Sequence, residues 1–258
     1  MDILRSVFMG ILQGLTEFLP ISSSGHLFAV PWLFGWKDFG LSFDVSLHLG
    51  TLVAVIAYFW HDWMDILRKW RQPLLWLLVL GCFPAAVAGL LFEDKIETLF
   101  RDPLFVGIFM IFMGLLLWFA EVAGKKSREL KDIGLKDSLV IGFSQVLALM
   151  PGVSRSGITM TAGLFSGMTR ETAARFSFLL STPIIFGAGI YKLKDIFTGG
   201  MGGNTPLIFL VGMLSSALVG FFAIKYLLKY LQAHTFYVFV WYRMVFGALI
   251  LAVVFFRR

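Results

Sequence analysis

The sequence predicts an all-α integral membrane protein with six transmembrane helices and two shorter, interrupted helical segments. Three observations lead to this prediction. The 258 residues are 58% hydrophobic with a mean hydropathy of +0.83, long apolar runs recur along the chain, and the second half repeats the first. An apolar run of about 20 residues crosses the hydrocarbon of a bilayer as a helix. We therefore expect a single membrane domain over residues 1–258 rather than a soluble fold.

Two hydroxyl-rich loops reveal the repeat. Residues 22–25 read Ser-Ser-Ser-Gly, and residues 154–157, which lie 132 positions later, read Ser-Arg-Ser-Gly. The same shift matches eight of the thirty positions from 6 to 35 without a gap. The further matches pair Ser6 with Ser138, Gly10 with Gly142, Gln13 with Gln145, Leu15 with Leu147 and Gly35 with Gly167.

Each half is expected to contain one interrupted segment followed by three spans. The first half, residues 1–121, has its interrupted segment at 3–35 and its spans at 43–61, 73–92 and 103–121. A linker at 122–135 leads to the second half, residues 136–258, with its interrupted segment at 136–167 and its spans at 172–191, 206–228 and 236–256.

Pro20 and Pro151-Gly152 break the two interrupted segments just before the serine loops. The flanks that remain, about 10–17 residues each, are too short to cross a bilayer alone, so we expect re-entrant helix–loop–helix elements. Three crossings per half is an odd number, and the second half should therefore be inverted relative to the first. The two loop tips are then expected to meet near the membrane midplane.

Basic residues predict the orientation. Lysine and arginine gather in the 62–72 loop, in the 122–136 loop and beside the 229–235 turn, and cytoplasmic loops carry such an excess. The acidic 93–102 loop and the glycine-rich 194–204 loop are then expected outside, together with both termini. Arg257 and Arg258 at the C-terminus do not fit this orientation.

Composition also excludes several classes of protein. Cys82 is the only cysteine, which rules out an internal disulfide and a cysteine metal cluster. Gln13 and Glu17 interrupt the first apolar run and no signal-peptidase site follows it, so we interpret it as part of the mature fold. The net charge of +6 suits loops beside anionic membrane lipids, and no basic patch with interleaved aromatic residues predicts a nucleic-acid partner.

Glu17 is the first candidate for chemistry. It lies four residues after Gln13, on the same face of a helix, in an otherwise apolar stretch. Ionisable groups inside a membrane are costly and usually functional, so Glu17 could act as a general base or acid or help to bind a metal. The alternative is an interfacial carboxylate that lipid headgroups keep wet.

Ser22, Ser23 and His26 follow within ten residues of Glu17. They supply the nucleophile and the base that an activated serine requires, with Glu17 as the orienting carboxylate. Ser23 is the expected nucleophile, Ser22 the reserve and His26 the base, while direct attack by water is the main alternative. A lone histidine, however, is more often a packing residue.

Arg155 replaces the middle serine in the second loop. A guanidinium inside a membrane needs an anionic partner and suits bidentate phosphate recognition, although an ion pair with Glu17 would also satisfy it. Backbone N–H groups near Gly25 and Gly157 would add anion donors at helix N-termini. The remaining expected substrate contacts are Gln13, Ser22, Ser24, Ser154, Ser156 and Thr159.

The two loops differ in a way that favours one composite site over two equivalent sites, because Glu17, Ser23 and His26 belong to one copy and Arg155 and Thr159 to the other. His48 and Asp44 are weaker candidates. Arg243 and Arg175 are expected to extend toward the cytoplasmic interface.

Residues 13–26, QGLTEFLPISSSGH, and residues 151–157, PGVSRSG, resemble the two signatures of the undecaprenyl-diphosphatase family, also called the bacitracin-resistance protein family. The resemblance covers essentially the whole chain. It implies hydrolysis of undecaprenyl diphosphate to undecaprenyl phosphate and phosphate at the outer face of the bacterial plasma membrane. This reaction recycles the lipid carrier for cell-wall synthesis and confers bacitracin resistance.

The resemblance further implies a homodimer, stimulation by a divalent cation such as Mg²⁺ or Ca²⁺, and no organic cofactor. By motif position, Glu17, Ser23, His26 and Arg155 match the family's catalytic residues. Gln13 occupies the first position of its (E/Q)xxxE element, where a neutral side chain cannot serve as a charged metal ligand. The rival hypothesis is a transporter that flips polyprenyl phosphate, because inverted repeats with broken helices are a transporter architecture.

Overall fold

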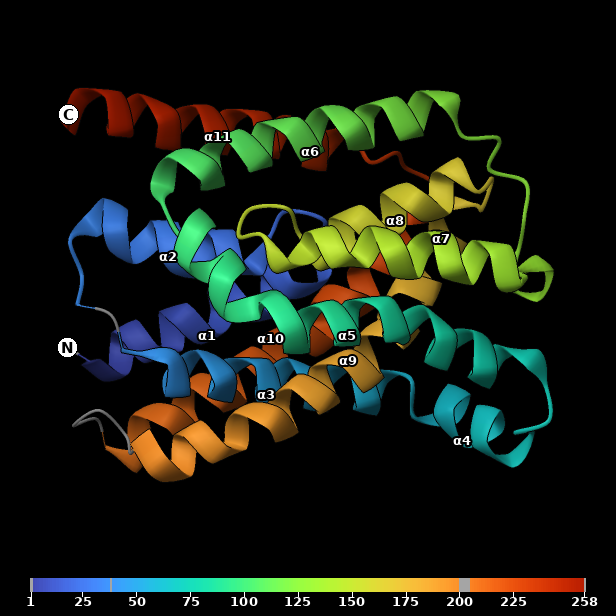
Figure 1. Ribbon diagram of the computed structural model, residues 1–258, viewed down its shortest axis with the longest axis horizontal. Coiled ribbons are helices and arrows are strands. Elements are labelled where there is room, and N and C mark those ends of the chain that lie inside the picture. The colour runs from blue at the N-terminus through green and yellow to red at the C-terminus, as the bar shows by residue number, and fades with distance from the viewer. Residues whose placement is uncertain (1, 38, 200–204, 258) are drawn as a thin grey trace.

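The computed structural model describes residues 2–37, 39–199 and 205–257, which form a stack of helices (Figure 1). The described part contains no strand, only an isolated bridge between Arg128 and Met168. The first half contains α1 Asp2–Phe18, α2 Ser23–Phe34, α3 Leu41–Tyr58, α4 Trp60–Arg68, α5 Pro73–Phe100 and α6 Pro103–Ala123. The second contains α7 Leu135–Val146, α8 Arg155–Phe165, α9 Arg170–Gly199, α10 Pro206–Leu231 and α11 Tyr237–Arg257, with short 3₁₀ turns at Leu130–Asp132 and Leu147–Leu149.

Six helices of the described chain are long and apolar enough to cross a membrane. They are α3, α5, α6, α9, α10 and α11, and they overlap the six predicted spans. The predicted class, an all-α membrane protein with six long apolar helices, is therefore confirmed. These helices carry many large apolar side chains that are exposed, as expected of helices that face lipid.

Three predicted loops are wrong in extent. The 62–72 segment is largely helix α4, residues 93–100 of the 93–102 segment are the end of α5, and α9 continues to Gly199. The physical reason is that charged residues raise the polarity of a helix without breaking it, and no proline stands between Phe59 and Gln72. Residues 200–204 of the predicted 194–204 loop lie outside the described residues.

The two interrupted segments are broken where proline predicts. α1 ends at Phe18 and α2 begins at Ser23, while α7 and its 3₁₀ turn end at Leu149 and α8 begins at Arg155. Both helices that follow a break have a serine N-cap with a positive φ, 75° at Ser22 and 77° at Ser154. Non-glycine residues rarely adopt this backbone, so its occurrence at both copies shows that the repeat extends to local geometry.

Packing of the two halves repeats as well. Ser6 Oγ on α1 donates to the carbonyl of Ile208 on α10, and Ser138 Oγ on α7 donates to the carbonyl of Leu77 on α5. A Cβ on Gly10 would meet the carbonyl oxygen of Gly212 at 2.4 Å. α1 therefore packs closely on α10 as α7 packs on α5, its counterpart under the 132-residue shift, and small residues permit the close approach.

The α1–α2 hairpin and the α7–α8 hairpin enter the stack from opposite ends (Figure 1). The first starts at the end that holds both chain termini, at the left of the figure, and the second starts at the end that holds α4. Both breaks lie in the interior of the stack, between the two ends. This arrangement brings the two serine loops together.

An ion pair anchors the linker between the halves. Arg128 donates to Oδ1 and Oδ2 of Asp137, both at 2.7 Å, and to the carbonyl of Ser166 at 2.8 Å. Burial opposes ionisation of Asp137, but hydrogen bonds from Arg128 and the Gly134 amide outweigh it and hold the pKa of this carboxyl below its usual value. The linker therefore packs against the starts of α7 and α9.

Candidate functional site

Side-chain and backbone contacts join the two loops directly. Ser156 Oγ, from the second loop, donates to the carbonyl of Leu19 in the first loop at 3.0 Å. Arg155, also from the second loop, donates to Glu17 at the end of α1. Residues 138 positions apart in the sequence thus share one site.

Glu17 is the centre of this site and is only 7% exposed. Its Oε1 accepts a hydrogen bond from Arg155 Nη2 at 2.9 Å. Its Oε2 accepts from Ser23 Oγ at 2.6 Å and from Gln13 Nε2 at 3.1 Å, and His48 Nε2 lies 3.6 Å from the same oxygen. A buried carboxylate with a cation on one oxygen and a hydroxyl on the other is equipped to move the hydroxyl proton.

Arg155 forms the ion pair that the sequence leaves open as an alternative. Its Nη1 donates to the carbonyl of Ser177 on α9 at 3.2 Å, while Nη2 holds Glu17. A guanidinium carries five N–H donors, so these two bonds leave capacity for an anion. A phosphate that binds these donors competes with Glu17 for the positive charge, so structural pairing and phosphate binding can alternate at this residue.

His26 is not placed as the sequence predicts. Its Nδ1 lies 2.7 Å from the carbonyl oxygen of Ser22, and its Nε2 lies 2.6 Å from the hydroxyl of Tyr242. Because a carbonyl only accepts, Nδ1 carries the proton and Nε2 of the neutral ring accepts from Tyr242. The expected arrangement, with His26 as base for Ser23 and Glu17 as its orienting group, is corrected: Ser23 bonds to Glu17 directly.

Several expected substrate contacts are buried in structural roles instead. Ser22 is fully buried and Ser154 is 4% exposed, and their hydroxyls accept from the amides of Gly25 and Gly157 as N-caps. These two amides, expected as anion donors, are therefore already engaged. Ser156 bonds to Leu19, as described above.

Thr159 is likewise 1% exposed and lies behind the site. Its Oγ1 donates to the carbonyl of Arg155 at 2.8 Å and lies 2.7 Å from Ser177 Oγ. Through these bonds Thr159 holds the first turn of α8, including the backbone of Arg155. A substrate contact by Thr159 is therefore replaced by a supporting role.

The accessible side of the site is formed by Ser24, which is exposed, and by the partly exposed Ser23, Arg155 and His48. Ser23 and Ser24 are the first two residues of α2, and a helix leaves its first N–H groups without helical acceptors. These amides and the Arg155 guanidinium are the donors that a phosphate would meet.

The repeat creates one site rather than two. Under the 132-residue shift, Ser23 corresponds to Arg155, Glu17 to Leu149, His26 to Ile158 and His48 to Leu180. The place equivalent to the Glu17–Arg155 pair therefore holds Leu149 and Ser23, which cannot form an ion pair. The same asymmetry between the two copies is the reason to expect one composite site.

The donor set does not suit a metal held by the protein alone. No group of three His, Cys, Asp or Glu side chains that could hold a metal occurs among the described residues. Glu17 is occupied by Arg155 and Ser23, and Gln13 is neutral. Gln13 Oε1 is buried and has no hydrogen-bond partner.

Arg243 and Tyr242 are the functional candidates that sequence reasoning missed. Arg243 does not reach an interface as expected; it is 1% exposed and bonds to carbonyls of both loops. The sequence position of Arg243 could have indicated this, because an arginine seven residues into an apolar span is costly unless groups inside the protein bind it. Arg175 is partly exposed and pairs with Asp62, in the 62–72 segment predicted to be cytoplasmic, beside the Phe59 ring.

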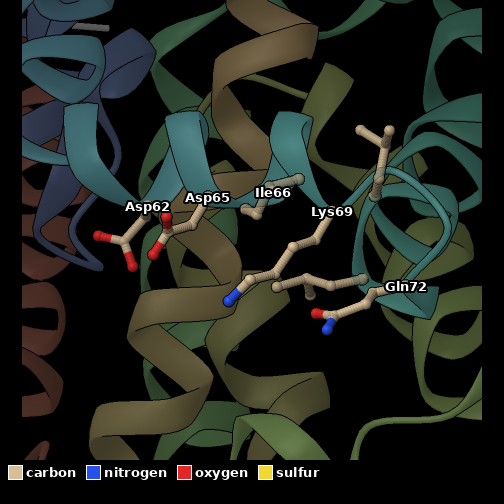
Figure 2. Close-up of a pocket in the computed structure, with 7 residues that line it drawn as sticks. Asp62, Asp65, Ile66, Lys69 and Gln72 are labelled. Carbon is tan, nitrogen blue, oxygen red and sulfur yellow. The ribbon is translucent and has the colours of Figure 1, made fainter.

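A hollow of about 160 Å³ lies away from this site, between α4 and the start of α5 (Figure 2). Asp62, Asp65, Ile66 and Lys69 of α4 line it, and none of Glu17, Ser23, His26 and Arg155 belongs to it. Arg175 of α9 pairs with Asp62 at this hollow.

Comparison with known proteins identifies the family. Residues 6–249 match the family of the bacitracin resistance protein BacA. This match covers far more than half of the chain, and the chain therefore belongs to that family.

The chain is also similar to relatives over nearly its whole length. It is 51% identical over 265 residues to an undecaprenyl-diphosphatase of Moorella thermoacetica, with 100% of both chains covered. It is 53% identical over 254 residues to one of Pelotomaculum thermopropionicum, covering 96% of this chain and 95% of the relative. It is 46% identical over 264 residues to one of Desulforudis audaxviator, again with both chains fully covered.

Proposed function

We propose that this protein is an undecaprenyl-diphosphate phosphatase, which hydrolyses undecaprenyl diphosphate to undecaprenyl phosphate and inorganic phosphate. The observation that carries the proposal is the contact chain Ser23–Glu17–Arg155, which places a hydroxyl, a carboxylate and a guanidinium together in a protein with six long apolar helices. The relatives named undecaprenyl-diphosphatase support the same reaction. Bacitracin resistance, which the resemblance implies, fits the name of the family.

In the first step, the terminal phosphoryl group binds beside Arg155 and the amides at the start of α2. Ser23 Oγ attacks the terminal phosphorus while its proton passes to Glu17 Oε2, which lies 2.6 Å away. The bond from phosphorus to the bridging oxygen breaks, and undecaprenyl phosphate leaves with that oxygen. Arg155 neutralises charge on the transferred group, which is the main contribution a protein makes to phosphoryl transfer.

In the second step, water hydrolyses the phosphoserine. Glu17, after losing the first proton to the departing phosphate or to water, accepts a proton from the attacking water and returns one to Ser23 Oγ. The net reaction consumes one water and releases inorganic phosphate. Direct attack by a water that Glu17 activates is the mechanistic alternative, and it requires no covalent intermediate.

The ion pair between Glu17 and Arg155 couples substrate binding to catalysis in this proposal. In the absence of substrate, Glu17 occupies Arg155 Nη2 at 2.9 Å. A diphosphate competes for the same guanidinium, and Glu17 then regains its full basicity toward Ser23. Binding and activation are coupled because both use Arg155.

Stimulation by Mg²⁺ or Ca²⁺ remains a proposal from the family resemblance. Since the described residues offer no three-ligand group, we assign no step to a metal bound by the protein. Diphosphate oxygens would supply most of the ligands, and Glu17 is the carboxylate of the site that could add one. Phosphate release measured with chelator and with each cation added back tests this.

We further propose that the two hairpins are re-entrant parts of an inverted repeat and that the site opens to the outside of the plasma membrane. The opposite directions of the hairpins support the inverted arrangement (Figure 1). Arg257, whose outward placement does not fit the basic-residue rule, has a local role: it donates to the carbonyls of Trp32 and Leu33 at the end of α2. Cysteine accessibility in intact cells tests the orientation.

The homodimer implied by the resemblance also remains a proposal. The outer faces of α6 and α11 carry exposed apolar side chains, Phe112 and Trp241 among them, that would face lipid or a second copy. Crosslinking in native membranes distinguishes the two.

A transporter of polyprenyl phosphate is the rival function, favoured by the two broken hairpins that meet inside the stack. The experiment that separates the two functions is phosphate release by purified protein in detergent, where no compartments exist. Turnover supports the phosphatase. Absence of turnover, together with lipid movement across liposomes, would support the transporter instead.

A further inference from the structure

Arg243 lies in the interior of α11 and is 1% exposed. The apolar residues around it in the sequence, Met244 and Val245 on one side and Trp241 and Tyr242 on the other, offer it no anion. A buried guanidinium without hydrogen bonds would be strongly destabilising. Its partners therefore explain why it is there.

Those partners are backbone carbonyls of both broken loops and of α6. Nη1 donates to Pro20 at 3.1 Å in the first loop, and Nη2 donates to Gly152 at 2.8 Å and to Val153 at 3.0 Å in the second. Nε donates to Met110 on α6 at 3.1 Å. One planar side chain thus connects three separate segments of the chain.

The loop carbonyls have a specific need for such a donor. Pro20, Gly152 and Val153 lie between the helices of their hairpins, where no helical N–H reaches them. At the depth of the hydrocarbon, buried carbonyls of this kind must find donors within the protein. Arginine meets this need because its donors point in several directions, whereas the ammonium of lysine is a single centre.

The loops are also strained at positions adjacent to these contacts. Ser22 and Ser154 have φ values of 75° and 77°, which non-glycine residues rarely adopt. Backbone in such regions persists only where the surroundings hold it. Arg243 holds it from the α11 side, two residues from the strained Ser22 and one from the strained Ser154.

We propose that Arg243 is a positioning residue that fixes the separation of the two loop tips, and through it the placement of Ser23 relative to Arg155. The inference rests on the proposed function. In the absence of substrate, the Glu17–Arg155 pair also ties the loops together, but diphosphate binding weakens that tie. Arg243 keeps the tips in register during the step in which the ion pair is open.

The test compares Arg243→Gln, Arg243→Lys and Arg243→Ala with the wild type, using phosphate release in detergent on folded, monodisperse protein. We expect Arg243→Gln to lower kcat about 10²-fold, the cost of a misplacement near 1 Å, with a smaller change in KM. Arg243→Lys retains the charge and should recover part of kcat. Guanidinium added to Arg243→Ala should restore turnover, and methylammonium at the same concentration should not.

Arg257→Gln is the matched control. It removes an arginine from the same helix that also donates to two carbonyls, those of Trp32 and Leu33, but far from the loop tips. Its kcat should stay within about twofold of the wild type, since a hydrogen bond at a helix end contributes little to turnover.

Wild-type kcat in folded Arg243→Lys overturns the proposal, because a single ammonium cannot serve both loops. Equal response of Arg243→Ala to guanidinium and methylammonium also overturns it, even if Arg243→Gln does not fold. Failure of the proposed function gives a different result, since the wild type itself would then release no phosphate.

Discussion

Replacing Glu17 with glutamine is the sharpest test of the proposed chemistry. The amide has nearly the volume of the carboxylate, so the packing of a side chain that is 7% exposed should hardly change. What changes is the charge beside Arg155 and the ability to accept a proton from Ser23. The two effects act on different kinetic constants.

The expected loss follows from the contacts. Ser23 Oγ lies 2.6 Å from Glu17 Oε2, which is within reach for direct proton transfer. Loss of a general base lowers kcat by about 10²–10⁴-fold, which corresponds to about 3–5 kcal/mol of barrier. KM should stay equal or fall, because Arg155 no longer has a carboxylate that competes with the diphosphate.

The assay is inorganic phosphate release from a polyprenyl diphosphate in detergent, with rates normalised to folded protein. Glu121→Gln is the matched control: Glu121 is 3% exposed and pairs with Arg170 at the far end of α6, away from the loops. This control should lose stability but keep its specific activity. A Glu17→Gln kcat within about threefold of the wild type refutes Glu17 as the base, and equal loss in both variants refutes a role confined to the site.

Three further outcomes are expected. Ser23→Ala should abolish a trappable phosphoserine and lower kcat by at least about 10²-fold; full turnover would leave only the direct-water mechanism. Tyr242→Phe removes one hydrogen bond to His26 and should cost about 1 kcal/mol of stability with kcat kept within about fivefold, whereas a larger kcat loss would make His26 more than a packing residue. Arg128→Gln removes the partner that lowers the pKa of Asp137, so the stability deficit of about 1 kcal/mol should persist at neutral pH and disappear only as acid protonates Asp137, below about pH 4. Thermal unfolding at several pH values checks it, and a deficit that is unchanged in acid would contradict it.

The helical scaffold was readable from the sequence for a simple reason. Hydrophobic length decides whether a segment can cross a membrane, and this property is local, so all six long apolar helices overlap their predicted ranges. Proline placement is equally local, and Pro20 and Pro151 mark the breaks in both hairpins. Helix ends were less readable, because Asp62 and Asp65 make α4 polar without ending it.

The candidate site was only half readable. Glu17, Ser23 and Arg155 stand out because polar groups are conspicuous in apolar sequence, and the structure brings these three into contact. His26 stands out equally but bonds to Tyr242, and no spacing rule relates residues that are 216 positions apart. Arg243 looked like an interfacial arginine, because depth alone does not show which carbonyls surround it.

The sequence by itself determined the membrane class, the repeat, the two breaks and the residue types available for chemistry, since each depends on composition or spacing along the chain. Only the tertiary structure decided which of these residues meet. Hydrogen bonds are short and directional, so the assignment of Ser23 to Glu17, of His26 to Tyr242 and of Arg243 to both loops depends on how distant helices pack.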